Sequence, residues 1–222
     1  KAMEKAICEK SFYEFFVRAF KIAEPAVPLS INFHHKYLCD VLQAEAERIK
    51  EGREKDKDII INIPFRSTKS LLVTVMFPAW CWAVYPKMRF ITASYSAEIS
   101  IEHATKSRDI IQSEWYQSHW GEVFQIKKDQ NLKARYENNY LGSRRATSVG
   151  GSVTGQGGDI ILVDDPTSPK NAASETERDN ANEWYKSTLY SRLNNPTTGV
   201  RIIIMQRVHE DDLSGYLLYN SP

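Results

Sequence analysis

Residues 59–70 of this 222-residue chain read IIINIPFRSTKS, and this stretch decides the fold. Its four isoleucines form a short apolar, β-branched run, which predicts a buried strand over residues 59–63. A polar loop from Pro64 to Ser70 follows, and a second apolar run begins at Leu71, which predicts a buried helix. A loop between a buried strand and a helix is where phosphates bind, because N–H groups at a helix N-terminus attract anions.

Two residues at the end of this loop have the chemistry of a nucleotide site. A lysine in the place of Lys69 reaches the β- and γ-phosphates, and a hydroxyl in the place of Ser70 coordinates Mg²⁺. The usual phosphate-loop pattern has glycine where this chain has Ile63 and Thr68, so the pattern is incomplete. The loop alone therefore leaves two interpretations open, a phosphate-binding loop and a polar turn with an exposed lysine.

A second motif, IILVDDP at residues 160–166, joins an apolar strand to two acids. A phosphate loop together with a strand that ends in an acid is the P-loop NTPase arrangement. In it the acid holds Mg²⁺ through water, and a neighbouring carboxylate orients the attacking water. Asp164 fits the metal role and Asp165 the water role, although glutamate is more usual in the second position. The alternative is an Asp-Asp-Pro turn that only caps the strand.

Residues 206–213, QRVHEDDL, form a third polar cluster at a strand end. Side chains adjacent in sequence point in different directions, so we do not expect these residues to converge on one metal ion. We expect Asp211 or Asp212 to cap a short final helix. Gln206 and Arg207 are placed to sense a γ-phosphate.

The segment GSRRATSVGGSVTG, residues 142–155, is rich in glycine. Its composition favours a flexible hairpin. The functional alternative is a backbone that approaches a ligand closely, with Arg144 and Arg145 available for phosphate.

Strand and helix patterns alternate along the chain. We expect further strands at residues 89–95, 160–163 and 200–205, and short antiparallel strands within 121–147. Strands that alternate with helices imply an α/β fold with a mostly parallel sheet covered on both faces. Ligands of such sheets bind at the carboxyl ends of the strands.

Apolar residues at helical spacing predict which helix faces are buried. Two helices are expected before the first strand. The first would bury Phe12, Phe15, Phe16, Ala19 and Phe20, and the second, between Ser30 and Gly52, would bury Phe33, Tyr37, Leu38, Val41, Leu42, Ala46 and Ile49. Later helices are expected over residues 96–115, with Ile99 inward, and 174–193, with Trp184, Tyr185 and Leu189 inward.

The composition excludes several classes of protein. Lys and Arg number 29 against 28 Asp and Glu, for a net charge of +1, which argues against a histone-like basic binder. Hydrophobic residues make up 42% of the chain, as in ordinary globular proteins. The three cysteines are odd in number and far apart, which predicts reduced thiols in a cytosolic protein. We expect no signal peptide and no membrane span, because the longest apolar run, 71–84, is short and contains Pro78.

Taken together, these segments resemble one family, the ATPase domain of the large subunit of tailed-bacteriophage terminases. The resemblance runs in order through nearly the whole chain. It is carried by residues 59–70 with Arg66 three before Lys69, 89–111, 142–166, Asn171, Trp184-Tyr185, Ser191-Arg192-Leu193 and 205–215.

The resemblance implies an ASCE-type, RecA-like P-loop ATPase core over residues 56–222, with residues 1–55 as a helical segment packed on it. The implied cofactors are ATP and Mg²⁺. The ATP-binding loop would comprise Pro64, Phe65, Arg66, Ser67, Thr68, Lys69 and Ser70. Residues 33–37 would line the adenine site.

The resemblance also implies roles for single residues. The catalytic residues would be Lys69, Asp165, Arg66 and Arg207, and the Mg²⁺ ligands Ser70 and Asp164. Gln206 and Arg207 would form the coupling motif. The arginine finger that one subunit supplies to the next would be one of Arg144, Arg145 and Arg192.

The function implied is hydrolysis of ATP to move double-stranded viral DNA into a procapsid. The implied partners are that DNA, the portal protein, the small terminase subunit and further copies of the chain in a ring. The implied place is the cytoplasm of the infected bacterial host, without a membrane. We expect no nuclease domain and no DNA cleavage, because the chain ends at Pro222, soon after the coupling motif.

Two other functions are compatible with these motifs. A helicase-like DNA translocase would need a second RecA-like domain. A non-hydrolysing module that binds DNA or the portal would have a phosphate loop too degenerate for nucleotide, and the missing glycines favour it. Intact Lys69, Ser70, Asp164 and Asp165 favour the ATPase, because a site without activity needs none of them.

Overall fold

The computed structural model describes residues 1–153 and 155–220. These residues form one seven-stranded sheet in the order β1-β7-β6-β2-β5-β4-β3. The strands are β1 (Ile59–Asn62), β2 (Phe90–Ser94), β3 (Ile126–Asn131), β4 (Arg135–Asn138), β5 (Ser143–Ser148), β6 (Ile160–Asp164) and β7 (Val200–Met205). The expected mostly parallel α/β sheet is confirmed.

The sheet has a parallel part and an antiparallel extension. Strands β1, β7, β6, β2 and β5 are parallel neighbours, whereas β4 pairs antiparallel with β5 and with β3. Parallel pairing brings the carboxyl ends of the five strands to one edge of the sheet. Any site built from strand ends therefore lies at that edge.

The flexible hairpin expected over residues 142–155 is wrong in its first half. Ser143–Ser148 is β5, an interior strand between β2 and β4. Gly142 has to be glycine here, because a Cβ atom would lie 2.0 Å from the backbone oxygen of Pro86. Composition hides this strand because its buried residue Arg144 is charged. Thr154, also in that segment, lies outside the described residues.

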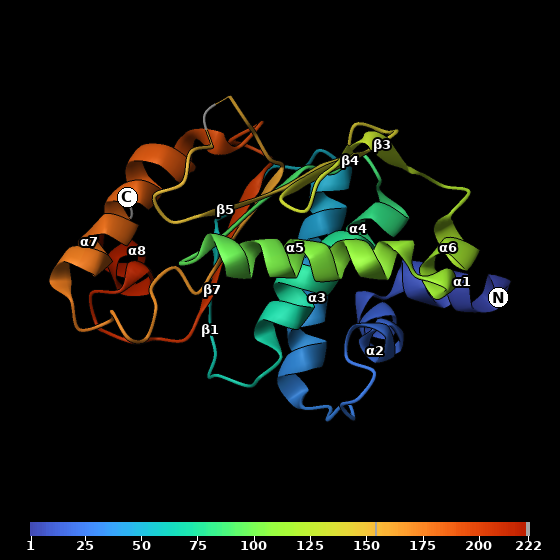
Figure 1. Ribbon diagram of the computed structural model, residues 1–222, viewed down its shortest axis with the longest axis horizontal. Helices are drawn as coiled ribbons and strands as arrows, with labels where there is room; N and C mark the ends of the chain where they lie inside the picture. The colour runs from blue at the N-terminus through green and yellow to red at the C-terminus, as the bar shows by residue number, and fades with distance from the viewer. Residues whose placement is uncertain (154, 221–222) are drawn as a thin grey trace.

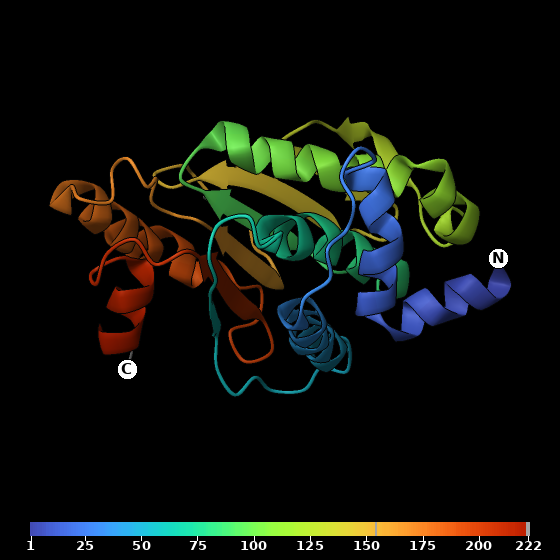
Figure 2. The same cartoon turned by 90° about the horizontal axis from the view of Figure 1, so that it is seen from below.

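Helices cover both faces of the sheet (Figures 1 and 2). One face carries α1 (Ala2–Lys10), α2 (Phe12–Ala23), α3 (Phe33–Lys50), the π-helix η1 (Leu71–Met76), α4 (Phe77–Val84), α5 (Ala97–Gln112) and α6 (Glu114–Trp120). The other carries α7 (Glu175–Trp184), the π-helix η2 (Tyr185–Leu189), the 3₁₀ turn η3 (Tyr190–Arg192) and α8 (Leu213–Asn220). Alternate residues of β6 feed the two cores: Ile160 and Leu162 point to the first and Ile161 and Val163 to the second.

The N-terminal helices share the larger core with the helices that follow β1. The ring of Phe12 lies 5.5 Å from the ring of Phe77 and 5.2 Å from that of Trp80. The five residues predicted to be buried by the first helix are all buried in α2. A boundary between two domains at residue 55 stays a prediction.

The second predicted helix exists as α3, but two of its residues that were expected to be buried are exposed. Phe33 is 83% exposed and Tyr37 is 66% exposed, whereas His35 is buried. The helix is rotated because His35 packs inward against the phosphate loop. Its N-cap is Asn32, and Gly52 follows its end with a φ of +68°.

The apolar run from Leu71 is helical, but its first part is a π-helix. Pro78 has no N–H group, so the carbonyl of Thr74, four residues earlier, has no α-helical donor. The buried guanidinium of Arg144 supplies one, with Nη2 2.6 Å from that oxygen. Among the described residues, no helix is long and apolar enough to cross a bilayer. Cys8, Cys39 and Cys81 are buried and form no disulfide.

Because helices cover both faces of the sheet, truncation of a side chain in a central strand should destabilise the protein. Leu162 is fully buried in β6, whereas Leu132 is 69% exposed between β3 and β4. Leu162→Ala should lower the free energy of unfolding in urea by about 3 kcal/mol, since it leaves a cavity in a packed core. Leu132→Ala, the same substitution, should change it by less than about 0.5 kcal/mol. Equal effects of the two would contradict this assignment of the core.

Candidate active site

The sheet brings the predicted motifs together at its carboxyl edge. The loop from Pro64 follows β1, Asp164 and Asp165 end β6, and Gln206 follows β7, which lies between those two strands. In the sheet Asn62 pairs with Met205, and Asp164 pairs with Ile204. The three polar clusters therefore meet side by side.

The loop has a glycine-type backbone at the position where the glycine is missing. Thr68 and Arg66 both have a φ of +59°, in the left-handed region that favours glycine. The sequence therefore has threonine at a position whose backbone conformation favours glycine. The Arg66 side chain is exposed.

Lys69 is buried and makes an ion pair with the second acid of the strand motif. Its Nζ lies 2.8 Å from Oδ2 of Asp165 and 4.9 Å from the centre of the Phe65 ring. Asp165 itself has a φ of +43°, a left-handed conformation for a non-glycine residue. The loop and the acid motif are thus joined by opposite charges.

Asp164 accepts hydrogen bonds from two hydroxyls of the helix that follows the loop. Ser70 Oγ lies 3.0 Å from its Oδ1, and Thr74 Oγ1 lies 2.7 Å from its Oδ2. Burial raises the pKa of Asp164 to about 6, against the opposing effect of the Thr74 hydrogen bond. A buried carboxylate beside a serine hydroxyl fits Mg²⁺, because oxygen atoms are its preferred ligands.

Thr74 and His103 also surround Asp164, and neither was predicted from the sequence. Thr74 is a hydroxyl residue in an apolar run and lies four residues after Ser70, on the same helix face, which was a usable signal. His103 Nδ1 lies 3.6 Å from Oδ2 of Asp164 and has no hydrogen-bond partner among the described residues. Burial, with the nearby positive charge of Arg144, lowers its pKa to about 4, so its ring is neutral at neutral pH. Its spacing of four from Ile99, predicted to face inward, was the signal for it.

Gln206 contacts both motifs. Its Oε1 accepts a hydrogen bond from the N–H of Phe65 over 3.1 Å, and its own N–H donates to Oδ1 of Asp165 over 3.0 Å. A displacement of either the loop or Asp165 would therefore change the hydrogen bonds of Gln206, at the end of β7. The coupling role of Gln206 stays a prediction.

Arg207 is hydrogen-bonded within its own loop. Its Nε donates to Asp212 over 3.0 Å, and its Nη2 donates to the carbonyls of His209 and Glu210. Asp212 is fully buried and also accepts from the N–H of Gly215 over 3.0 Å. The expected cap of the final helix is therefore Asp212, and the guanidinium of Arg207 is already engaged by it.

The three arginine-finger candidates lie in different surroundings. Arg144 is buried inside the larger core, so its guanidinium cannot be presented to a neighbouring subunit, and its expected role as a finger is wrong. Arg145 is partly exposed. Arg192 lies beside Leu193, whose bridge to Gly158 precedes β6, and hence at the opposite edge of the sheet from Asp164. For Arg145 and Arg192 the finger role stays a prediction.

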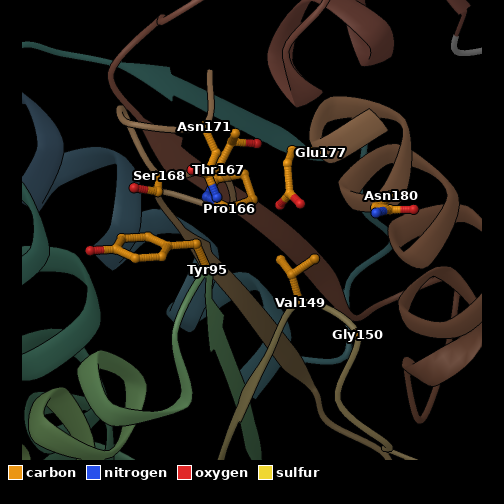
Figure 3. A pocket seen from close by; sticks show the side chains of 9 residues that line it. All are labelled: Tyr95, Val149, Gly150, Pro166, Thr167, Ser168, Asn171, Glu177 and Asn180. Atoms are coloured by element: carbon orange, nitrogen blue, oxygen red, sulfur yellow. The ribbon is translucent and has the colours of Figure 1, made fainter. Parts of the chain in front are cut away.

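Two cavities adjoin at the carboxyl edge, and Tyr95 lines both. The first, of about 290 Å³, is lined by Phe65, Ser70, Ser94, Tyr95, Ile99, His103, Asp164, Asp165 and Pro169. The second, of about 330 Å³, has Tyr95 and Glu177 on opposite sides and Gly150 of the glycine-rich segment at its border (Figure 3). The predicted metal residues Ser70 and Asp164 belong to the first cavity, which is therefore the candidate site.

Comparison with known proteins identifies the fold. No protein-family model matches the sequence, and no curated protein matches it. The crystal structure of the HK97 bacteriophage large terminase superposes with a TM-score of 0.53 at 12% identity, over 92% of this chain and 40% of that one. The large terminase of a thermophilic bacteriophage, in complex with ADP, gives a TM-score of 0.40 at 12% identity, over 74% of this chain and 37% of that one.

These observations define the class of fold. The mostly parallel seven-stranded sheet flanked by helices is an α/β fold of the kind found in a bacteriophage large terminase. One structure with this fold is the HK97 large terminase, and the chain spans 40% of its length. The expected likeness to terminase large subunits is thus confirmed at the level of the fold.

The buried carboxylate predicts a pH-dependent stability. The folded-state pKa of Asp164 lies above its ordinary value, so the folded chain binds this proton more tightly than the unfolded chain does. Its contribution is therefore most favourable at low pH and falls as the pH rises from about 4 to above 6. Without Mg²⁺, Asp164→Asn should be more stable than the unchanged chain by about 2 kcal/mol at pH 8, and no more stable at pH 4.

Urea denaturation at both pH values measures this difference. Asp56→Asn is the matched control, because the Asp56 side chain is 92% exposed. The control should show no such pH-dependent gain. If Asp164→Asn lowered the free energy of unfolding by the same amount at pH 4 and pH 8, the prediction would be contradicted.

The cap of α8 makes a second stability prediction. Asp212→Ala removes a buried acceptor of three backbone N–H groups, those of Val208, His209 and Gly215. It also removes the carboxylate that pairs with Arg207, so the free energy of unfolding should fall by about 3 kcal/mol. Asp211→Ala, at an exposed position, should change it by less than about 0.5 kcal/mol. Similar losses for both variants would show that the cap is misassigned.

Proposed function

We propose that this chain is the ATP-hydrolysing domain of a viral DNA-packaging motor, within a terminase large subunit. The observation that carries the proposal is the pairing of Lys69 with Asp165 and of Ser70 with Asp164 at one sheet edge, 2.8 Å and 3.0 Å apart. This pairing joins a phosphate-loop lysine and hydroxyl to two strand-end acids. The fold shared with the HK97 large terminase supports the proposal.

The described residues fit ATP and Mg²⁺. Ser70 and Asp164 would hold the metal ion, and Lys69 with the N–H groups of the loop would hold the phosphates. When bound, Mg²⁺ would supply neutralisation of the charge that develops on the phosphate oxygens. Burial of Asp164 strengthens its attraction for a cation, because the surroundings screen charge less than water does.

Lys69 and Asp165 would change partners when ATP binds. Lys69 is held by Asp165 in this structure. A phosphate oxygen at the loop would compete for this ammonium group, and Asp165 would be released to orient the attacking water and to take up its proton. The ion pair therefore keeps the water-orienting carboxylate occupied until a phosphate arrives.

Gln206 would report this exchange to the rest of the chain. It contacts Phe65 in the loop and Asp165 at the acid motif, so a shift of Asp165 alters its position. Arg207, the next residue, is joined through Asp212 to the start of α8. In this proposal Arg207 is a positioning residue that transmits the shift to α8, rather than a catalytic residue that contacts phosphate.

The partners and the place of action belong to the same proposal. They are double-stranded viral DNA, the portal protein, the small terminase subunit and further copies of this chain in a ring, in the cytoplasm of the infected bacterium. The finger arginine supplied by a neighbouring copy would be Arg145 or Arg192. Residues 33–37 would lie near adenine, since His34 Nε2 is 3.0 Å from the carbonyl of Ser67 in the loop.

Nucleotide binding and hydrolysis separate the roles of the two paired residues. Lys69→Ala should weaken Mg²⁺-dependent binding of a non-hydrolysable ATP analogue by about 50-fold, because charge-assisted hydrogen bonds to phosphate are lost. Asp165→Asn should retain binding and lower the rate of hydrolysis by about 100-fold or more. Calorimetry measures the first effect and phosphate release the second.

A matched control is Lys57→Ala, because Lys57 is 83% exposed and should leave binding unchanged. If the folded chain and the Lys69→Ala variant bind the analogue equally, the loop is not a nucleotide site. Failure of the unchanged chain to bind would favour the non-hydrolysing binding module instead.

A further inference from the structure

The phosphate loop has a threonine where its backbone conformation favours glycine. Thr68 has a φ of +59°, and the left-handed conformation is unfavourable for a residue with a Cβ atom and more so for a β-branched one. Such a residue persists only where its surroundings hold it. The contacts of Thr68 therefore show what replaces the missing glycine.

Two histidines at the start of α3 contact the loop. His35 Nε2 lies 2.6 Å from Thr68 Oγ1, and His34 Nε2 lies 3.0 Å from the carbonyl of Ser67. The Thr68 hydroxyl donates in turn to that same carbonyl over 2.6 Å. The start of α3, 33 residues away in sequence, thus contacts the Thr68 side chain and the carbonyl of the residue before it.

The hydrogen bonds have a definite direction. The N–H of Asn32 lies 2.9 Å from His35 Nδ1, and the carbonyl oxygen of Asn32 lies farther from the same nitrogen, at 3.2 Å. We assign Nδ1 as the acceptor of the shorter bond, because a backbone N–H can only donate, and Nε2 then carries the proton. His35 therefore donates to the Thr68 hydroxyl, which donates to Ser67. Burial and the neighbouring His34 lower the pKa of His35, which keeps the ring in this neutral form.

The ring of His35 is itself held in place by the N-terminal helices. It is 2% exposed and stacks on the ring of Phe16 from α2, with centroids 5.4 Å apart and planes inclined by 21°. The capping hydrogen bond between His35 and Asn32 also fixes the orientation of the ring at the start of α3. Because α2 and α3 belong to the larger core, the position of Nε2 is set by packing and not by the loop.

We propose that His35 is a positioning residue of the phosphate loop, which takes over the role of the missing glycine by holding Thr68 in its left-handed conformation. The inference rests on the proposed function, because this conformation matters for activity only if the loop binds phosphate. In this proposal the N-terminal helices preorganise the loop for nucleotide binding.

Two substitutions of His35 separate its two hydrogen bonds. His35→Asn places an acceptor near Nδ1 and keeps the cap, but it cannot reach Thr68. His35→Gln places a donor near Nε2 and keeps the bond to Thr68, but it loses the cap. The companion change is Thr68→Gly, which adopts a positive φ without a clamp.

Binding of a non-hydrolysable ATP analogue with Mg²⁺ is measured by calorimetry on these variants and on the combination of His35→Asn with Thr68→Gly. His35→Asn should weaken binding about fivefold when residue 68 is threonine and less than about twofold when residue 68 is glycine. His35→Gln should bind more tightly than His35→Asn. Equal losses in both backgrounds would overturn the proposal, because His35 would then affect binding independently of Thr68.

Hydrogen–deuterium exchange of residues 64–70 without nucleotide tests the clamp independently of ATP. His35→Asn should speed the exchange of this segment when residue 68 is threonine and leave it unchanged when residue 68 is glycine. Exchange that responds equally in both backgrounds would overturn the clamp. If exchange follows the expected pattern while no variant binds the analogue, the clamp stands and the proposed ATPase function fails.

Discussion

The carboxylate of Asp164 is 2% exposed at the end of a fully apolar strand, and the surrounding elements reflect the cost of that burial. Its two oxygens are satisfied by hydroxyls from Ser70 and Thr74. Thr74 is held in turn by Arg144, which donates to the carbonyl that Pro78 leaves without a partner. The burial of Asp164 raises its pKa, and Thr74 links this acid to Arg144, a second buried charged residue.

The rest of the site is assembled by pairs of residues that are far apart in the sequence. Lys69 meets Asp165, Gln206 meets Phe65, and His35 meets Thr68. Each contact joins the phosphate loop to a different part of the fold: the acid strand, the strand between them and the N-terminal helices. A change in the loop on binding of nucleotide would therefore act on three parts of the molecule at once.

Much of the fold could be predicted from local pattern. The apolar β-branched runs mark β6 and β7, because strands buried on both faces need continuous hydrophobic sequence. The stripe of α2 is predicted correctly for the same reason, since the whole face is apolar. The run at 59–63 also marks a strand, but β1 is the edge strand and only Ile61 in it is buried, so the predicted full burial is wrong. Local pattern fails where a polar residue is buried by a distant partner. It fails for β5, whose Arg144 is inside the core, and for α3, whose buried His35 rotates Phe33 and Tyr37 outward.

Local pattern was enough to predict the mostly parallel sheet and the residues at its carboxyl edge: a lysine and a hydroxyl after one strand and two acids after another. Only the tertiary structure decided which groups act together. It showed that Arg207 is engaged by Asp212, that His103 stands beside Asp164, and that histidines of α3 hold the loop. The physical reason is that composition and periodicity report burial and local geometry. Hydrogen bonds between residues 33 to 150 positions apart depend on how the elements pack.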